Sequence, residues 1–236
     1  MISVCIASYN GAKYIKDQLL SITKQLGVDD EVVISDDMST DETRQIIESL
    51  NDSRIRIIDG PKKGAMRNFE NALMASKGDY IFLSDQDDVW LDGKVDSMMA
   101  GLMNYDLVFS DCKIVNTSLE VINESYFSML PPKLGVINNI AKNHFLGCCM
   151  AFNRRVLDYA LPFPKGIVMH DIWIGLCASI CGKVGIVYKP LMLYRRHDNT
   201  VSYAAGTSAN SIGYRLYYRA KILQCIINRR LARFKF

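Results

Sequence analysis

Short apolar runs rich in β-branched residues alternate with stretches of helical periodicity over the first hundred residues, and this rhythm constrains the fold more than any other feature. The alternation predicts an α/β fold built on a parallel, doubly wound, Rossmann-like sheet. Such sheets bind ligands beyond the carboxyl ends of their strands, so the residues there are candidates for a site. The predicted strands are Ile2–Ala7, Glu31–Ser35, Arg54–Asp59, Tyr80–Ser84 and Leu107–Ser110.

Local signals predict where the other elements begin and end. Ser39 and Glu42 have the spacing of a capping box, which predicts a helix start. A further helix is predicted from about Leu91 to Met103. The rhythm weakens after Cys112, so a long connection is expected there. Beyond it the patterns predict a strand, a helix and a strand, at Phe145–Phe152, His170–Cys181 and Val184–Tyr194.

The composition predicts a soluble, cytosolic protein. A chain of 236 residues with 49% hydrophobic and 22% charged residues can bury one large core or two small ones. Its apolar stretches are shorter than the roughly 18 residues of a membrane span, and no basic segment precedes the first strand. The seven cysteines are an odd number without C-x-x-C spacing, which favours reduced, buried thiols over disulfides or a zinc site.

A cluster of acids follows the fourth predicted strand, where the sequence reads Ser-Asp-Gln-Asp-Asp-Val-Trp from Ser84. Carboxylates at the end of a buried strand are unfavourable unless a positive charge neutralises them. Asp85 and Asp87 lie two positions apart, so in an extended chain they project to the same side. Oxygen ligands select Mg²⁺ or Mn²⁺, and the pattern therefore predicts a divalent metal site. The alternative is a polar turn in which Asp88 caps the following helix.

A second polar cluster follows the second predicted strand. A carboxylate from Asp36 or Asp37 could accept a hydrogen bond from a pyrimidine N–H or a ribose hydroxyl. Helix capping by Ser39 and Asp41 is compatible with this interpretation, because the two earlier acids are not needed for the cap. Tyr9, after the first strand, could stack on a base. The chain has neither a G-x-G-x-x-G motif after that strand nor a Walker lysine loop, which argues against dinucleotide redox chemistry and P-loop phosphoryl transfer.

Four segments taken together resemble the family 2 glycosyltransferases, and in particular bacterial enzymes similar to rhamnosyltransferases. The segments are Ser3–Gly11, Ser35–Asp41, Asn68-Phe69 and Ser84–Trp90. The resemblance covers nearly all of residues 1–200. It implies a GT-A fold, a nucleotide-diphosphate sugar as donor, Mg²⁺ or Mn²⁺ as cofactor and inversion at the anomeric carbon. The Gln-x-x-Arg-Trp motif of processive synthases is missing, which favours the addition of a single sugar.

The resemblance also implies roles for individual residues. Tyr9 would stack on the base, Asp37 would accept the pyrimidine N–H, and Asp85 with Asp87 would form the D-x-D pair, of which Asp87 would be the direct metal ligand. Asp171 would open a helix as the catalytic base, for which the alternative is an ordinary N-cap. His197 would be a further metal ligand or touch the diphosphate. The other residues implied at the nucleotide-sugar site are Ala7, Asn10, Arg67, Ser84, Gln86 and Arg195.

The last thirty residues have a different character. No acidic residue follows Asp198, whereas seven lysines and arginines do, and apolar residues are interleaved with them from Ser211 onward. This pattern predicts a basic amphipathic helix, which either docks on an anionic membrane or packs its apolar face on the domain. Nucleic-acid binding is not favoured, because the basic charge is confined to this tail.

These observations predict one GT-A domain in two halves, followed by a tail. Residues 1–111 would bind the nucleotide sugar, residues 112–206 would form a lobe that binds the acceptor and carries the catalytic base, and residues 207–236 would form the tail. The predicted activity is transfer of one sugar, with rhamnose from dTDP-rhamnose as the leading donor, to a growing, lipid-linked surface glycan. The location would be the cytoplasm or the inner face of the plasma membrane. The alternatives are a metal-dependent sugar nucleotidyltransferase and a non-catalytic scaffold that binds nucleotide sugars.

Overall fold

The structure is a computed structural model that describes residues 1–167, 169–196 and 211–233. The strands are β1 (Ile2–Ser8), β2 (Glu31–Asp36), β3 (Ile55–Asp59), β4 (Tyr80–Ser84), β5 (Val89–Trp90), β6 (Leu107–Val115), β7 (Val121–Asn123), β8 (Met150–Asn153) and β9 (Val184–Arg195). The α-helices are α1 (Ile15–Thr23), α2 (Thr43–Ser49), α3 (Ala65–Ala75), α4 (Lys94–Leu102), α5 (Tyr126–Met129), α6 (Val136–Ala141), α7 (Arg154–Ala160), α8 (His170–Cys181) and α9 (Ile212–Arg233), and one 3-10 turn, η1, covers Gly147–Cys149.

Within the described residues, one nine-stranded sheet runs through the molecule in the order β3-β2-β1-β4-β8-β6-β9-β5, and β7 pairs with β6 at the side. The first four strands in this order are parallel, as the alternation of strands and helices predicts. The remaining strands form a mixed region, because β8 pairs antiparallel with both β4 and β6. The α/β fold class is confirmed, and the doubly wound pattern holds for the first half of the sheet.

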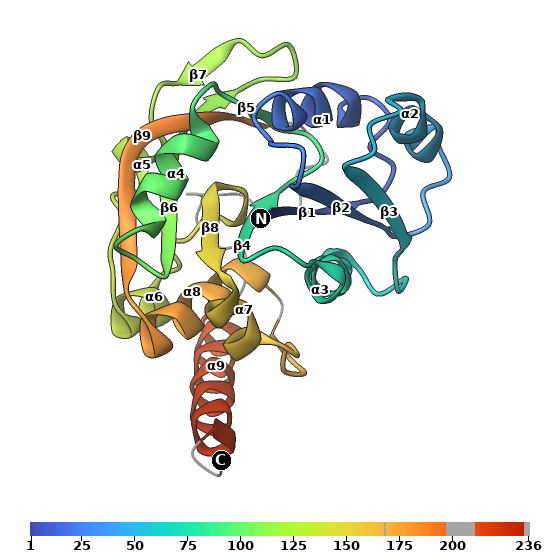
Figure 1. Cartoon of the computed structure of the whole chain (residues 1–236). Helices are drawn as coiled ribbons and strands as arrows, with labels where there is room; N and C mark the ends of the chain where they lie inside the picture. Colours follow the sequence, from blue (N-terminus) through green and yellow to red (C-terminus); the bar gives the residue numbers. More distant parts are fainter. Residues whose placement is uncertain (168, 197–210, 234–236) are drawn as a thin grey trace.

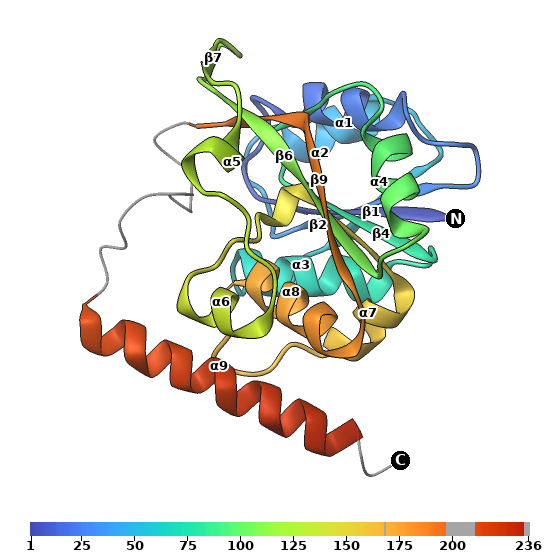
Figure 2. The same ribbon diagram turned by 90° about the vertical axis from the view of Figure 1, so that its left-hand side faces the viewer.

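Helices cover both faces of the sheet (Figures 1 and 2). α1, α2 and α4 lie on one face, and α3, α6, α7 and α8 lie on the other. The core between them is apolar, and its largest fully buried side chains include Trp90, Trp173, Phe82 and Phe109. All seven cysteines are free thiols, and every one except Cys181 is buried, as predicted. This arrangement leaves the carboxyl ends of β1, β2 and β4 as neighbours along one edge.

Three local predictions differ from the structure near the site. α4 begins at Lys94, with Gly93 as its N-cap, rather than near Leu91, and the alternative in which Asp88 caps this helix is thereby excluded. Gly93 adopts a left-handed conformation that favours glycine, and this conformation sets the start of the helix. The capping box does not form, because Glu42 is the N-cap of α2 and Ser39 bonds elsewhere. The strand expected at Phe145–Phe152 is shorter, since η1 occupies its middle.

The boundary predicted between residues 111 and 112 falls inside β6, so the two halves share a strand. The basic tail forms α9, as its periodicity predicts. Among the described residues, none of the helices combines the length and the apolar character that a bilayer span requires.

Candidate active site

The register of β1, β2 and β4 brings two of the predicted clusters together. Ser8 lies opposite Asp36 in the β1–β2 pair, and Ile6 lies opposite Ser84 in the β1–β4 pair. The amide of Asp37 donates to the carbonyl oxygen of Ser8 at 2.8 Å, which continues the pairing beyond the strands. The loops after β1, β2 and β4 therefore start from one line across the sheet, and the sequence predicts this convergence correctly.

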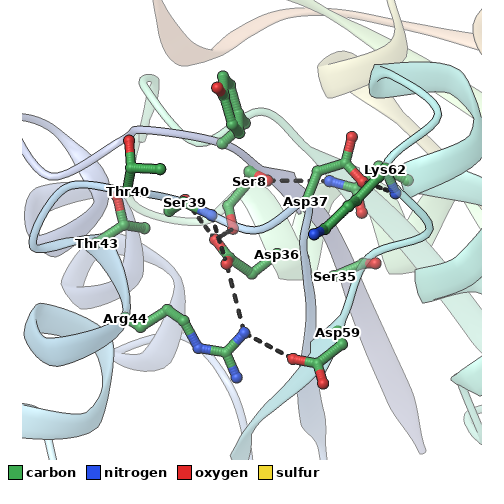
Figure 3. Close-up of polar contacts among 12 residues, drawn as sticks. Ser8, Ser35, Asp36, Asp37, Ser39, Thr40, Thr43, Arg44, Asp59 and Lys62 are labelled. Carbon is green, nitrogen blue, oxygen red and sulfur yellow. Dashed lines mark hydrogen bonds and ion pairs between the residues drawn. The ribbon is translucent and has the colours of Figure 1, made fainter.

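The two acids after β2 have different environments (Figure 3). Asp36 is fully buried and its carboxylate accepts hydrogen bonds from the hydroxyl of Ser8 at 2.9 Å and the hydroxyl of Ser39 at 2.6 Å. The guanidinium of Arg44 lies 3.4 Å from the same carboxylate and also pairs with Asp59. Asp36 is thus a structural acid that fixes the loop following β2.

Asp37 is only partly buried, and its carboxylate reaches the loop after β3. It accepts hydrogen bonds from the backbone amides of Lys62 at 2.5 Å and Gly64 at 3.2 Å. Gly60 has to be small here, because a Cβ atom at this position would lie 2.7 Å from the Cα atom of Asp37. A carboxylate has about four acceptor sites, so these two bonds leave capacity for a ligand N–H. The geometry is compatible with the predicted contact to a base, which stays a prediction.

Tyr9 has a 55% exposed side chain on a backbone that is tightly held. Its amide donates to the side-chain oxygen of Gln86 at 2.9 Å, and the side-chain nitrogen of Gln86 donates back to the Tyr9 carbonyl at 3.0 Å. Asn10 connects the β1 loop to the β2 loop, since its side-chain oxygen accepts from the amide of Thr40 at 2.8 Å. Gln86 and Asn10 therefore orient the loops, a role that the sequence motifs did not reveal.

The acids after β4 form the most unusual cluster in the described residues. A carboxylate oxygen of Asp85, one of Asp88 and the sulfur of Cys148 all lie within 4.8 Å of one another. Asp88 is fully buried, and while one of its oxygens accepts from the amide of Arg195 at 2.9 Å, the other has no partner among the described residues. Burial, followed by the nearby charge of Asp87, raises the pKa of Asp85 to about 7, and the same two causes raise the pKa of Asp88.

This donor set fits a divalent cation. The oxygen of Asp88 that lacks a partner among the described residues is available as a ligand for a bound metal ion. The sequence predicts Asp85 with Asp87 as the pair, whereas the group that the structure gathers contains Asp85, Asp88 and Cys148. Sequence reasoning missed the last two residues because Asp88 was interpreted only as a cap and Cys148 as part of the core. The adjacent carboxylates of Asp87 and Asp88 were the available signal.

Arg195, at the end of β9, fixes the main chain of the loop that carries the acids after β4. Its side chain is almost fully buried, and it donates to the carbonyl oxygens of Asp87 and Thr117, both at 2.7 Å. The guanidinium also lies 4.5 Å from the centre of the Tyr14 ring. One terminal nitrogen, Nη2, lacks a partner among the described residues. The predicted pairing with a phosphate stays a prediction, for which that nitrogen is the available donor.

The remaining predicted residues of the nucleotide-sugar site differ in placement. Ser84 is fully buried and its hydroxyl bonds to Gln18, and Ala7 lies in β1 beside Ser35. Arg67 pairs with Glu70 and donates to the carbonyl of Phe163 at 3.1 Å, and its predicted contact with a phosphate stays a prediction. His197 lies outside the described residues. The structure therefore brings the loops that carry Tyr9, Asp37 and Asp85 to one edge of the sheet.

Asp171 lies in the first turn of α8 and is not its N-cap, which is Met169. The carboxylate is 6% exposed and accepts from the amide of Ile172 at 2.6 Å and from the side-chain amide of Asn143 at 3.0 Å. Burial raises its pKa to about 6, although these hydrogen bonds oppose the shift. The charge of Asp171 in turn contributes to the raised pKa of Asp85.

The η1 turn connects Asp171 to the acid cluster. A Cβ atom at Gly147 would lie 2.7 Å from the imidazole Nε2 of His170 and 3.5 Å from the Cβ of Asp171. The next residue is Cys148 of the acid cluster. His170 itself stacks on Phe69, with 4.0 Å between ring centres, and burial lowers its pKa to about 4. A glycine is thus required where the main chain passes between the base candidate and the metal candidate.

Comparisons with known proteins identify the family. The Glycosyl transferase family 2 model matches residues 3–161. The dTDP-rhamnosyl transferase RfbG of Shigella flexneri is 28% identical over 237 residues, which is 92% of this chain and 76% of the relative. The UDP-Glc:alpha-D-GlcNAc-diphosphoundecaprenol beta-1,3-glucosyltransferase WfgD of Escherichia coli is 27% identical over 198 residues, which is 78% of this chain and 76% of the relative.

A solved structure supports the same fold. Residues 1-349 of S. aureus TarS, in complex with UDP-GlcNAc, superpose with a TM-score of 0.72 at 20% identity. The match covers 96% of this chain and 66% of the TarS chain, and at this identity it shows the fold alone. The family model spans well over half of the chain, the relatives are named as glycosyltransferases, and the sheet with its acid-tipped fourth strand has the GT-A arrangement. The chain belongs to the family 2 glycosyltransferases.

Proposed function

We propose that the protein is a metal-dependent, inverting glycosyltransferase that moves one sugar from a nucleotide diphosphate to a lipid-linked glycan. One observation carries this proposal: Asp85 and Asp88 at the tip of β4 lie with Cys148 within 4.8 Å of one another, and Asp85 lies close enough to Asp171 for their charges to interact. Transfer of a sugar requires both a group that stabilises the leaving diphosphate and a base for the acceptor hydroxyl. Asp85 and Asp88 would serve the first role by holding a metal ion, and Asp171 would serve the second.

The nucleotide would bind over the loops that follow β1 and β2. Tyr9 offers an exposed ring for stacking on the base, and the carboxylate of Asp37 keeps acceptor capacity for a pyrimidine N–H. Both residues are held by neighbouring loops, so little ordering is needed when the nucleotide binds. This preorganisation supports a pyrimidine nucleotide as the carrier.

The diphosphate would lie next to the acids after β4. Mg²⁺ or Mn²⁺ would be held there by Asp85 and Asp88, with Asp87 as a further ligand implied by the family resemblance. When bound, the ion supplies positive charge for the phosphate oxygens of the leaving group. Arg195 keeps the acid loop in position through the carbonyl of Asp87.

The acceptor hydroxyl would approach Asp171. Its raised pKa of about 6 keeps the carboxylate mostly ionised at neutral pH while making it a stronger base than an exposed aspartate. Asn143 orients the carboxylate through its side-chain amide. Asp171 would accept the hydroxyl proton while the acceptor oxygen forms its bond to the anomeric carbon and the diphosphate leaves from the opposite face.

The sugar and the acceptor are proposed from likeness to relatives. The similarity to the Shigella flexneri dTDP-rhamnosyl transferase favours rhamnose from dTDP-rhamnose, and UDP-hexoses are the competing donors. The similarity to an Escherichia coli enzyme whose acceptor is a diphosphoundecaprenol favours a lipid-linked acceptor. Such an acceptor would place the protein at the cytoplasmic face of the plasma membrane.

A panel of nucleotide sugars tests this proposal. Each compound is screened for thermal stabilisation with Mn²⁺, with Mg²⁺ and with EDTA, because a ligand that binds the native state raises the Tm. The compound that stabilises most is then supplied with a lipid-linked acceptor, and the product is examined for an inverted anomeric centre. The proposed function would be contradicted if nucleotide sugars raised the Tm equally with and without EDTA. It would also be contradicted if the donor stayed unaltered with every acceptor tried.

A further inference from the structure

Helix α9 packs on the domain through only one of its faces. Ile222 and Cys225 are buried in the main core, and Tyr218 and Ile226 pack against it. Arg229 fixes the same face, since its guanidinium donates to the carbonyl of Leu161 at 2.6 Å and lies 5.7 Å from the centre of the Trp173 ring. The sequence left open whether the tail packs on the domain or docks elsewhere, and these contacts show that it packs.

The opposite face of α9 is also apolar. Leu216, Leu223, Ile227 and Leu231 follow one another at seven, four and four residues, so at 3.6 residues per turn they share one stripe. Together with Tyr217 they are between 45% and 65% exposed. Figure 2 shows α9 along the outer edge of the molecule, beyond α6 and α8, with no described element on its far side. A helix that is apolar on two faces has a second surface to cover.

The charges around this outer stripe all have one sign. Arg230 and Arg219 flank it on one side, and the whole segment from 211 to 233 contains no acidic residue. Two copies of the helix packed stripe to stripe would bring arginines together without any carboxylate to pair with them, which disfavours a second copy as the occupant. An anionic lipid surface complements both the apolar stripe and its basic flank.

A groove on the other side of the outer stripe is also lined by positively charged residues. It lies between α9 and residues 161–165, has a volume of about 580 Å³, and is lined by Lys165, Lys221 and Arg229 among apolar and amide side chains. None of the described residues that line it carries a carboxylate. Lipid headgroups next to a helix lying in the membrane interface would therefore meet cations on both of its sides.

The position of α9 relative to Asp171 is consistent with such a surface. Arg219 donates to the carbonyl of Ala141, at the end of α6, and Asn143 two residues later donates to the carboxylate of Asp171. The helix thus braces the segment that orients the proposed base.

We infer that the outer face of α9, formed by Leu216, Tyr217, Leu223, Ile227 and Leu231 with flanking arginines, docks the protein on an anionic lipid bilayer. A lipid contact at this face extends the proposed function. The docking itself does not depend on sugar transfer, and only its biological role rests on the proposed function. The apolar side chains would enter the boundary between headgroups and acyl chains, while the arginines stay among the phosphates.

Vesicle flotation of the full chain tests the inference. We expect binding to vesicles of phosphatidylglycerol mixed with phosphatidylcholine, much weaker binding to phosphatidylcholine alone, and weakening at high salt. The double substitution Leu223→Glu with Ile227→Glu should lower the partition coefficient about tenfold or more, because it places two charges in the apolar contact. The double substitution Val28→Glu with Met103→Glu is the matched control, since it adds the same charge at two exposed apolar positions far from α9 and should leave binding unchanged.

Two further measurements keep the inference separate from the proposed activity. Hydrolysis of the nucleotide sugar in the absence of membrane should be equal in the α9 variant and the wild type, whereas a variant that has lost its fold would fail both this assay and a Tm measurement.

A wild-type protein that does not float with anionic vesicles overturns the inference, whatever its activity. A concentration-dependent dimer in sedimentation that the same substitutions abolish, without vesicle binding, would assign the face to a second copy and also overturn it. Vesicle binding by a protein that transfers no sugar would refute the function and leave the docking surface standing.

Discussion

The loop after β2 and the loop after β4 are both rich in acids, yet they differ in how far the buried carboxylate is hydrogen-bonded. Asp36 is buried with hydrogen bonds from two hydroxyls and an amide, and with an arginine beside it. Asp88 is equally buried, but one of its oxygens has no partner among the described residues and its pKa is raised. A satisfied buried acid stabilises a fold, whereas an unsatisfied one costs stability and persists where it serves a ligand. We therefore expect Asp36 to support the fold and Asp88 to serve a ligand.

The largest effect should come from removing the two acids after β4 whose pKa values are raised. The double substitution Asp85→Asn with Asp88→Asn should lower kcat/KM about 10⁴-fold, because the loss of a single preorganised group that stabilises charge costs about 10²–10³-fold. The metal-free protein should become more stable at neutral pH. Both native pKa values are raised above 3.8, so the carboxylates destabilise the fold as pH rises toward 7 and make no difference below about 4.

Steady-state kinetics and Tm values at pH 4 and pH 7.5 check this pair of expectations. Asp92→Asn alters an exposed acid between β5 and α4, is the control, and should change neither quantity. A double variant that unfolds more easily at neutral pH would mean that these acids are scaffold after all, and the contrast between the loops would disappear.

The next largest effect concerns the base. Asp171→Asn should lower kcat about 10³-fold, within the usual range for a general base, and leave the affinity for the nucleotide sugar unchanged. In the wild type, kcat/KM should rise as pH increases through about 6 and then level off, because the carboxylate acts only when ionised. The variant should lose that acidic limb. Asp96→Asn alters an acid in the first turn of α4 instead and should retain the wild-type profile.

A stability measurement tests the scaffold side of the comparison. Asp36→Ala should lower the free energy of unfolding by about 2–3 kcal/mol, since it leaves buried hydroxyl and amide donors without their acceptor. Asp59→Ala removes the exposed partner of the same arginine and should stay within about 0.5 kcal/mol of the wild type. Urea denaturation of both variants gives these values. Equal losses would indicate that Arg44, rather than the buried hydrogen bonds, holds the loop.

The smallest expected effect is at the base-stacking position. Tyr9→Ala should weaken binding of the nucleotide sugar about tenfold, as expected for the loss of one aromatic stack, with little change in Tm. Titration calorimetry measures this affinity, and Tyr188→Ala, which truncates another exposed tyrosine, is the control. An unchanged affinity would show that the base does not contact this ring.

The sequence predicted the parallel half of the sheet, because each strand and helix there carries its own periodic pattern. Its prediction of α8 at His170–Cys181 has the same bounds as the structure, because the helix is an uninterrupted apolar segment. The strands β6, β8 and β9 of the mixed half were predicted with different bounds, but their order was not, since the pairing of β8 with β4 and β6 depends on contacts distant in sequence. Periodicity reports local geometry and carries no information about such pairing.

The candidate site divides in a similar way. Asp85 could be named from sequence because it follows a recognisable strand, and Asp171 because its segment resembles that of the family. Cys148 could not, since it reaches the acids only through the η1 turn, which interrupts an apolar run that resembles a strand. Gln86 and Arg195 were assigned to the ligand, yet their side chains make main-chain contacts that shape the loops. Sequence motifs identify which residues matter without distinguishing a group that touches a ligand from one that supports it.

The central place of β8 has a consequence for how the chain acquires its shape. This strand is synthesised after β1, β2, β3, β4 and β6, yet it is the one that joins the β4 side of the sheet to the β6 side. Until residues 150–153 leave the ribosome, β4 and β6 each present an open edge, and such edges invite pairing with other chains. The first four strands can associate early, since their contacts are closer in sequence. The two parts of the candidate site can then meet only after this short strand has paired with both β4 and β6, so we expect the site to assemble late during synthesis of the chain.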